Sequence, residues 1–154
     1  MPDLAIVIPA FNEAARLPRT LEATRAYVAG RGIDARILVV DDGSTDETAA
    51  VAASFAGVEV VRCPSNRGKG HAVRQGVLHA DGRRILTMDA DLATPIEEIV
   101  HLEAALDDGA RVAIGSRPLR ESQLLVRQPW HRECAGRLFN GVVQAIATPG
   151  IHDT

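Results

Sequence analysis

Two carboxylates one residue apart, Asp89 and Asp91, follow the apolar run of residues 85–88. In an extended segment alternate side chains point to the same side, so these two carboxylates could bind one hard divalent cation. Without a partner the two charges would repel each other, which indicates that a metal ion or a sugar hydroxyl lies between them. Acidic pairs also occur in turns and at helix caps, so this interpretation depends on the rest of the chain.

Two further segments carry candidate binding residues. Asp41 and Asp42 begin the segment Asp-Asp-Gly-Ser, where a carboxylate could accept hydrogen bonds from a ribose or a base. The same residues could form only a turn and a helix cap. Residues 66–70, Asn-Arg-Gly-Lys-Gly, offer two glycines, two cations and a helix start, and could hold an anion. Neither segment has the spacing of a P-loop or of a dinucleotide-binding glycine-rich turn, which argues against an NTPase and an NAD enzyme.

The composition is that of an ordinary globular protein. The chain has 154 residues, of which 46% are hydrophobic and 24% are charged, enough for one domain with its own core. The net charge of −3 argues against a general nucleic-acid-binding protein. Acids gather at residues 41–47 and arginines at residues 117–137, which suits a metal ion with a phosphorylated substrate; the alternative is two solvated faces.

The cysteines, the start of the chain and the length of its apolar runs bear on the cellular location of the protein. Cys63 and Cys134 show no metal-ligand spacing and point to a reducing compartment. The five histidines show no metal-ligand spacing either. No signal peptide is evident, and no apolar run approaches the ~20 residues that cross a bilayer. We therefore expect a cytoplasmic protein, with the inner face of the cell membrane as an option.

Elements that would position these residues follow from the alternation of short apolar runs with longer amphipathic ones, which predicts a mostly parallel sheet with helices on both faces. The expected strands are residues 4–8, 37–40, 58–61, 85–88 and 112–114, and the expected helices are residues 13–29, 46–55, 70–79, 96–106 and 131–147. Asn12 is expected to precede the first helix, Ser44 and Glu47 suit a capping box at the second, and Pro95 suits the first turn of the fourth.

Polar residues follow four of the expected strands: residues 9–13, 41–46, 89–91 and 115–117. Ligands of open α/β sheets bind outside the carboxyl ends of the strands, so these segments are expected to meet in one crevice. Such convergence is much harder to obtain by chance than any single motif.

Four segments together resemble the family 2 inverting glycosyltransferases with the GT-A fold. They are residues 7–13 (VIPAFNE), 39–46 (VVDDGSTD), 66–70 (NRGKG) and 89–91 (DAD), and they occur in the family's order. The resemblance extends from Leu4 to about Arg117. Within the family, residues 89–95 and 150–154 look most like the dolichyl-phosphate glucosyltransferases, which are close to the polyprenyl-phosphate mannose synthases.

The resemblance implies an α/β fold of the GT-A (Rossmann-like) type, a three-layer sandwich with a mostly parallel central sheet. No strand follows the last expected helix, so we expect the fold to be truncated at its C-terminal side. Residues 1–154 would form a single catalytic domain. Residues 1–116 would bind the nucleotide sugar, and residues 117–154 would begin an acceptor-side arm and helix.

Individual residues acquire roles from the same resemblance. Pro9, Phe11 and Glu13 would line the nucleotide pocket, Asp41 would hold the base or ribose, and Asp42 with the turn Gly68, Lys69 and Gly70 would support that pocket. Asp89 and Asp91 would bind Mg²⁺ or Mn²⁺ at the donor diphosphate. Arg117, with Arg127 and Arg132 as further candidates, would hold the phosphate of an acceptor lipid. Ala93 departs from related mannose synthases, which often carry a polar side chain there, so water or the diphosphate would complete the metal shell.

The expected reaction moves a sugar from UDP-glucose or GDP-mannose to a polyprenyl or dolichyl phosphate with inversion, at a peripheral membrane contact. Two alternatives stay open. One is a soluble family member that acts on a hydroxyl acceptor, for which Asp153 is the late candidate base. The other is a non-catalytic nucleotide-sugar-binding fragment. We expect no nucleic-acid partner, and a homodimer is left open.

Overall fold

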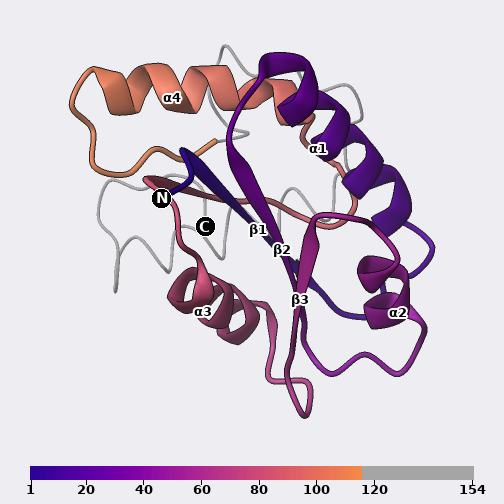
Figure 1. Ribbon diagram of the computed structural model, residues 1–154. Coiled ribbons are helices and arrows are strands. Elements are labelled where there is room, and N and C mark those ends of the chain that lie inside the picture. Colours follow the sequence, from indigo (N-terminus) through magenta and orange to yellow (C-terminus); the bar gives the residue numbers. More distant parts are fainter. Residues whose placement is uncertain (116–154) are drawn as a thin grey trace, which may run out of the picture. The chain divides into compact units, whose positions relative to one another are not determined.

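The computed structural model describes residues 1–115, and Figure 1 shows their strands and helices. The chain divides into two compact units, residues 1–99 and 100–154. All four described strands and the first three helices belong to the first unit. In chain order the elements are β1 (Leu4–Ala10), α1 (Leu17–Arg31), β2 (Ala35–Asp41), α2 (Thr48–Ala53), β3 (Val58–Arg62), α3 (Lys69–His79), β4 (Arg84–Thr87), the 3₁₀ turn η1 (Ile96–Glu98) and α4 (Ile99–Asp107).

The four strands form one parallel sheet in the order β3-β2-β1-β4. Ala10 at the end of β1 lies opposite Asp41, and Asp41 lies opposite Arg62 at the end of β3. On the other side of β1, Val7 pairs with Thr87, the last residue of β4. The register therefore brings the carboxyl ends of all four strands to the same edge of the sheet, as the sequence predicted.

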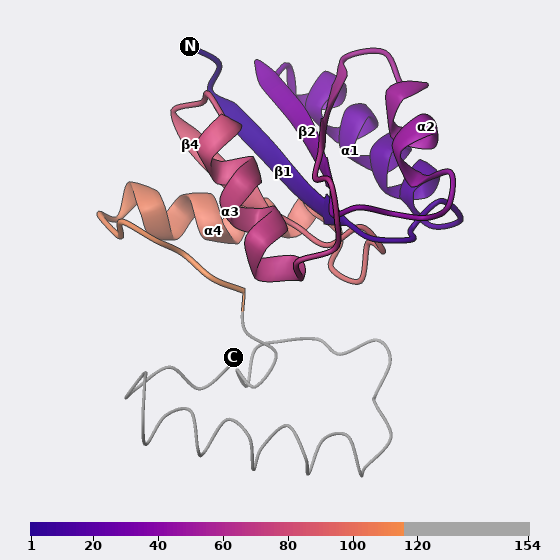
Figure 2. The same cartoon turned by 90° about the horizontal axis from the view of Figure 1, so that it is seen from below.

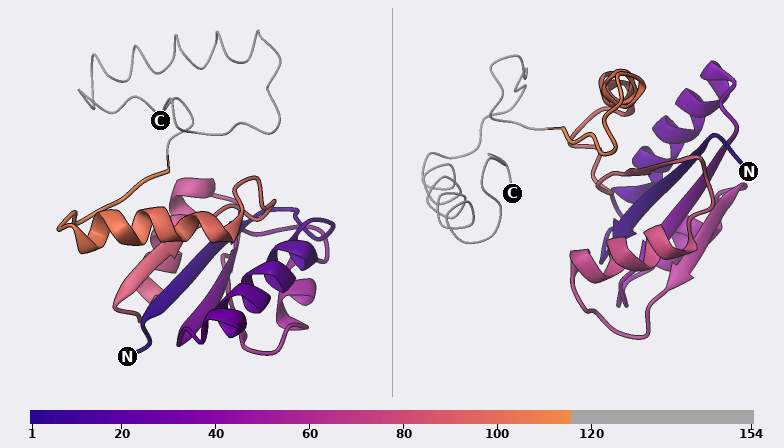
Figure 3. Two further views of the ribbon diagram at one scale, coloured as in Figure 1. Left: turned by 90° about the horizontal axis from the view of Figure 1, so that it is seen from above. Right: turned by 90° about the vertical axis from the view of Figure 1, so that its left-hand side faces the viewer.

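Helices cover both faces of this sheet, which gives three layers (Figure 2). On one face Ile6, Ile8 and Val39 pack with residues of α1 and α2, and on the other Val7 and Val40 pack with α3. The right-hand view of Figure 3 shows α1 and α3 on opposite sides of the strands. Strands buried on both faces need apolar residues at every position, which explains the continuous Val and Ile runs of β1 and β2.

The first expected helix begins later than predicted. α1 starts at Leu17, with Pro18 in its first turn, and ends at Arg31, followed by the left-handed cap residue Gly32 with φ of 62°. Residues 13 and 14 stay outside the helix because their N–H groups bind side chains of the loop after β2. The N–H of Glu13 donates to Thr48 Oγ1 and that of Ala14 donates to Asp46 Oδ2.

The predicted capping box at the second helix is wrong. α2 begins at Thr48, and Ser44 Oγ instead accepts the N–H of Asn12 across 3.0 Å. In return Asn12 Oδ1 accepts the N–H of Thr45, and the N–H of Thr48 donates to Asp46 Oδ1. Asn12 and Ser44 therefore bind the other loop's backbone, and the N–H at the start of α2 is satisfied by Asp46 and not by Ser44. At the fourth helix Pro95 lies at the cap position directly before η1, one residue ahead of the first turn in which it was expected.

The expected strand at residues 112–114 is also wrong. The structure forms no strand there, and the side chains of Val112 and Ile114 are 78% and 59% exposed. A strand needs a neighbour for its backbone hydrogen bonds, and no described strand pairs with this segment.

Several sequence predictions lie outside the described residues. They are Arg117, Arg127, Arg132, Asp153, the arm at residues 117–130 and the helix at residues 131–147. Among residues 1–115, no helix combines the length and the apolar character that crossing a membrane requires.

Close packing of α3 on the sheet gives a test of the fold. A methyl group on Gly76 would lie 2.2 Å from Val7 Cγ1 and 2.9 Å from Val40 Cγ2, and neither stiff valine can move away easily. We expect Gly76→Ala to lower the free energy of unfolding by roughly 1–3 kcal/mol, measured by urea denaturation. Gly70→Ala is the matched control on the same helix, because nothing lies within 4 Å of its added methyl group. Equal stability of the two variants would contradict this packing.

Candidate functional site

A hollow of about 350 Å³ opens at the carboxyl edge of the sheet, within the first compact unit. We call it the carboxyl-edge hollow. Its lining comes from the ends of β1, β2 and β4 and the start of α3. These residues are Pro9, Ala10, Phe11, Glu13, Asp42, Asn66, Gly68, Lys69, Ala72, Asp89, Ala90 and Asp91.

Most of the predicted donor-site residues are therefore brought together. Eight of them line the hollow: Pro9, Phe11, Glu13, Asp42, Gly68, Lys69, Asp89 and Asp91. Asp41 and Gly70 do not line it, and Arg117 lies outside the described residues.

Asp42 holds the segment before α3. Its buried carboxylate accepts the N–H of Arg67 at 3.1 Å and the N–H of Gly68 at 2.7 Å. The anion cradle predicted at residues 66–70 is thus filled, at these two N–H groups, by the protein's own carboxylate. Charge-assisted hydrogen bonds of this kind offset much of the cost of burying a charge.

Asp41 is fully buried at the end of β2 and has one unused oxygen. Oδ1 accepts the N–H of Ser44 at 2.9 Å. Oδ2 has no hydrogen-bond partner, although Arg62 Nε lies 3.4 Å away as an ion pair without hydrogen-bond geometry. A buried acceptor without a partner costs free energy, so this atom is a place where a donor from a ligand would be favourable.

The two carboxylates that opened the sequence analysis lie in a turn. β4 ends at Thr87, and Ala90 and Asp91 form the turn that follows, so the expected extended geometry is wrong. The register with β1 stops at Val7, which leaves residues 89–91 without a neighbouring strand to keep them extended. Asp89 and Asp91 nevertheless line the same hollow.

Side chains of helix α1 bind the acidic turn at residues 89–91. Thr20 Oγ1, which is buried, donates to the carbonyl of Ala90 at 2.7 Å. One turn further along α1, Thr24 Oγ1 lies 3.8 Å from Met88 Sδ. Positions four apart lie on the same face of a helix, so one face of α1 fixes the position of the acidic turn.

Each acidic group of the hollow's rim has a basic neighbour. Lys69 Nζ lies 2.6 Å from Asp89 Oδ1, and Arg16 Nη1 lies 3.9 Å from Asp91 Oδ2. Arg16 also donates to the carboxylate of Glu13. The repulsion predicted for an acidic pair is therefore relieved here by two cations of the chain, both of them exposed.

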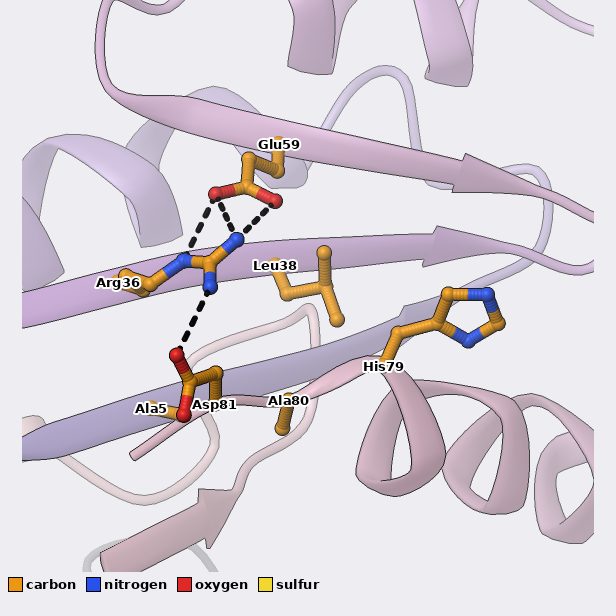
Figure 4. A pocket seen from close by; sticks show the side chains of 7 residues that line it. All are labelled: Ala5, Arg36, Leu38, Glu59, His79, Ala80 and Asp81. Carbon is orange, nitrogen blue, oxygen red and sulfur yellow. Dashed lines mark hydrogen bonds and ion pairs between the residues drawn. The ribbon is translucent and has the colours of Figure 1, made fainter. Parts of the chain in front are cut away.

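A second hollow, at the other end of the strands, has no room for a ligand (Figure 4). Its volume is about 10 Å³, enough for a single water molecule. Arg36 extends across it and forms a bidentate ion pair with the carboxylate of Glu59. On the other side Arg36 Nη1 lies 3.8 Å from Asp81 Oδ2. The hydrogen bonds and the charge of Glu59 raise the pKa of Arg36, so this group is a structural ion-pair network.

Sequence reasoning missed one group of side chains. Asp42, Cys63 and His71 place a carboxylate oxygen, the sulfur and a ring nitrogen within 4.8 Å of one another. They come from three separate segments, so linear spacing carried no signal of their convergence. Burial, then the charges of Asp42 and Asp41, raise the pKa of the Cys63 thiol.

The chain belongs to glycosyl transferase family 2, because the model of that family matches residues 5–148. A dolichyl-phosphate beta-glucosyltransferase from Drosophila melanogaster is 36% identical over an alignment of 171 positions. The alignment covers 99% of this chain and 52% of that protein. An undecaprenyl-phosphate 4-deoxy-4-formamido-L-arabinose transferase from Enterobacter sp. (strain 638) is 37% identical, over 97% of this chain and 46% of its own length. The chain spans about half the length of these curated relatives.

Solved structures agree with the family. Glucosyl-3-phosphoglycerate synthase from Mycobacterium tuberculosis, crystallised with Mn²⁺ and uridine-diphosphate-glucose, matches with a TM-score of 0.57 and 29% identity. The match covers 70% of this chain and 40% of that one. The predicted fold class, an α/β sandwich of the GT-A type with a parallel central sheet, is confirmed.

The hydrogen bonds of the Asp46 carboxylate give a pH test. Asp46 accepts the hydroxyl of Thr48 and the N–H of Ala14, and the Thr48 hydroxyl bond is the main cause of its lowered pKa. A carboxyl group whose pKa is lower in the folded state adds stability above its unfolded value, and that stability is lost as the pH falls below about 4. The urea midpoint of the wild type should therefore fall more steeply below pH 4 than that of Asp46→Asn. Asp108→Asn, which removes an exposed carboxylate after α4, should keep the steep fall; a shallow fall in this control would contradict the assignment.

Proposed function

We propose that this protein binds a nucleotide sugar in the carboxyl-edge hollow and transfers the sugar, with inversion, to a polyprenyl phosphate. The observation that carries the proposal is the convergence of Asp42, Asp89, Asp91 and Phe11 on one hollow of about 350 Å³. That volume lies in the range of small-molecule sites, which is about 300–1,000 Å³. Family membership supports the same class of reaction.

The nucleoside half of the donor is assigned to the β1 and β2 side of the hollow. Phe11 is 42% exposed there and presents a ring on which a base can stack. Asp41 lies buried behind this side of the hollow with Oδ2 free to accept a hydrogen bond, so a base N–H or a ribose hydroxyl would reach that atom only if the loop in front of it moved. Asp42 supports the pocket indirectly, because it fixes Gly68 and thereby Lys69.

The metal is assigned to Asp89 and Asp91. Their carboxylate oxygens are hard donors, which fit Mg²⁺ or Mn²⁺, and both side chains are about half exposed or less, at 50% and 37%. When bound, such a cation neutralises charge that develops on the leaving diphosphate. Ala93 has no side-chain ligand to offer and instead donates its N–H to Asp91 Oδ1, so water or the diphosphate completes the shell.

Lys69 is the residue that we expect to exchange partners. Its ion pair with Asp89 is exposed, and exposed pairs contribute only about 0–1 kcal/mol, so a divalent cation can replace the ammonium. The released ammonium stays at the start of α3, beside the hollow, where it can bind a donor phosphate. The same argument applies to Arg16 and Asp91.

The assignment of the acceptor and of the donor sugar is based on the relatives. A dolichyl-phosphate and an undecaprenyl-phosphate transferase are among them, which supports a lipid phosphate as the acceptor. A phosphate is already an anion and needs no general base, and the guanidinium of Arg117 suits it. UDP-glucose is the first candidate donor and GDP-mannose the second. Because the acceptor is a lipid, we place the reaction at a membrane surface, with the inner face of the cell membrane as the proposed location.

Donor binding is tested first, by calorimetry with UDP-glucose and GDP-mannose, each with and without Mn²⁺. Asp91→Asn removes a charged ligand, so it should weaken the Mn²⁺-dependent affinity by roughly tenfold or more, about 1.4 kcal/mol. Asp81→Asn is the matched control, because Asp81 lies at the opposite end of the strands and lines only the small hollow. Undiminished Mn²⁺-dependent binding in Asp91→Asn would show that the metal site is wrongly assigned.

Transfer is tested separately, by following nucleotide diphosphate release with undecaprenyl phosphate, with free sugars and without acceptor. We expect release above background with the lipid phosphate and not with free sugars. Release with a free sugar would favour the hydroxyl-acceptor alternative. Donor binding without any transfer would favour a non-catalytic module.

A further inference from the structure

We propose that Asp42, Cys63 and His71 form a second metal site, suited to a borderline ion such as Zn²⁺. The site would be distinct from the hard-cation pair Asp89 and Asp91. It offers one carboxylate, one thiolate and one imidazole, a donor set that zinc prefers and that Mg²⁺ does not. Three protein ligands leave the fourth tetrahedral position for water. The proposal does not depend on the proposed transfer reaction.

The distances are close to those of a zinc site. His71 Nδ1 lies 3.7 Å from Asp42 Oδ1 and 4.0 Å from Cys63 Sγ. Around a tetrahedral zinc ion, bond lengths of about 2.0–2.3 Å place nitrogen roughly 3.4 Å from oxygen and roughly 3.6 Å from sulfur. The two contacts of His71 therefore need to shorten by a few tenths of an ångström, which a rotation of its ring can supply. The carboxylate oxygen of Asp42 and the sulfur of Cys63 lie within 4.8 Å of each other, and closing that gap needs a movement of the Cys63 or Asp42 side chain.

The ring of His71 is already oriented for this role. Nδ1 faces Asp42 and Cys63, and Nε2 lies 3.5 Å from the side-chain amide of Gln75, one helical turn further along α3. The Gln75 atom next to His71 Nε2 is the amide nitrogen, so the amide must turn by 180° to bring its oxygen there. Nε2–H then donates to that oxygen and Nδ1 keeps its lone pair for a metal. A partner on the second ring nitrogen is the usual means of fixing the tautomer of a metal-binding histidine.

Metal binding balances the charge of the site. The Cys63 thiol is protonated at neutral pH, because burial and the neighbouring carboxylates disfavour its anion. On binding, the Cys63 S–H bond breaks, the sulfur bonds to the metal and one proton leaves to solvent. The thiolate and the Asp42 carboxylate together neutralise the two positive charges of the ion.

Asp42 keeps its structural bond in this arrangement. Oδ1 faces His71 and shares the N–H of Arg67 with Oδ2, at 3.2 and 3.1 Å, whereas Oδ2 alone makes the short bond to the N–H of Gly68. A metal on Oδ1 therefore leaves the start of α3 in place. The entry route runs beside His71, whose side chain is 18% exposed, because the side chain of Asp42 is only 3% exposed.

The test uses Co²⁺ as a spectroscopic substitute for Zn²⁺, with no nucleotide present, in a Cys134→Ser background. We expect one Co²⁺ per chain, a thiolate-to-cobalt charge-transfer band, the visible bands of a four-coordinate ion, and displacement by Zn²⁺ with a proton released on binding. Cys63→Ser and Cys63→Ala should abolish the charge-transfer band. His71→Ala should weaken Co²⁺ binding by at least roughly tenfold. Circular dichroism confirms that each variant is folded.

Two controls separate this site from the others. His79→Ala alters an exposed histidine of the same helix and should leave the spectrum unchanged, as should Asp89→Asn in the proposed donor site. No charge-transfer band in the parent protein, or a band that survives Cys63→Ser, would overturn the proposal. So would displacement of Co²⁺ by equal concentrations of Mg²⁺. Loss of Mn²⁺-dependent donor binding would leave this result untouched, because the test contains no donor.

Discussion

The buried carboxylate of Asp42 and the backbone N–H groups of Arg67 and Gly68 hold the end of β2 against the start of α3. A charge with so little exposure is tolerated only while these donors are present, so the loop before α3 has little freedom to move away. Gly43 enforces the same arrangement sterically: its φ is +72°, and a methyl group there would lie 2.6 Å from the carbonyl carbon of Ser65. Because Gly68 is fixed, Lys69 begins α3 at the rim of the carboxyl-edge hollow.

The opposite wall of the hollow depends on a different contact. β1 is an inner strand of the described sheet, with β2 and β4 on either side, and β4 is short enough that the acidic turn leaves the sheet early. Thr20 of α1 then holds Ala90 between the two carboxylates. The site is therefore assembled from both sides of β1, by a buried carboxylate on one side and a buried hydroxyl on the other. This division also explains why the polar residues that converge here are far apart in the sequence.

Much of this could be predicted from the sequence. Four strands and the parallel sheet follow from apolar runs and from the polar segments placed directly after them. The family followed from the resemblance of four of these segments, and eight of the residues that the resemblance singled out line one hollow. Predictions that treated a segment by itself were less successful. Ser44 and Glu47 have capping-box spacing. The hydroxyl oxygen of Ser44 instead accepts the backbone N–H of Asn12, which is 32 residues away. Residues 112–114 have strand-like composition but no strand beside them. Asp41 and Asp42 are adjacent and alike, and only the fold shows that one lies buried behind the hollow and the other lines it.

If one hollow binds the metal and the nucleotide together, substoichiometric Mn²⁺ added in the presence of UDP-glucose should broaden the backbone amide signals of that hollow in the ¹H–¹⁵N spectrum. We expect the broadening to centre on residues 89–93 and to extend to residues 11–13 and 66–69, with Arg36 and Glu59 unaffected. Broadening centred on the opposite end of the strands would contradict a shared site. So would an unchanged broadening pattern in the double variant Asp89→Asn/Asp91→Asn.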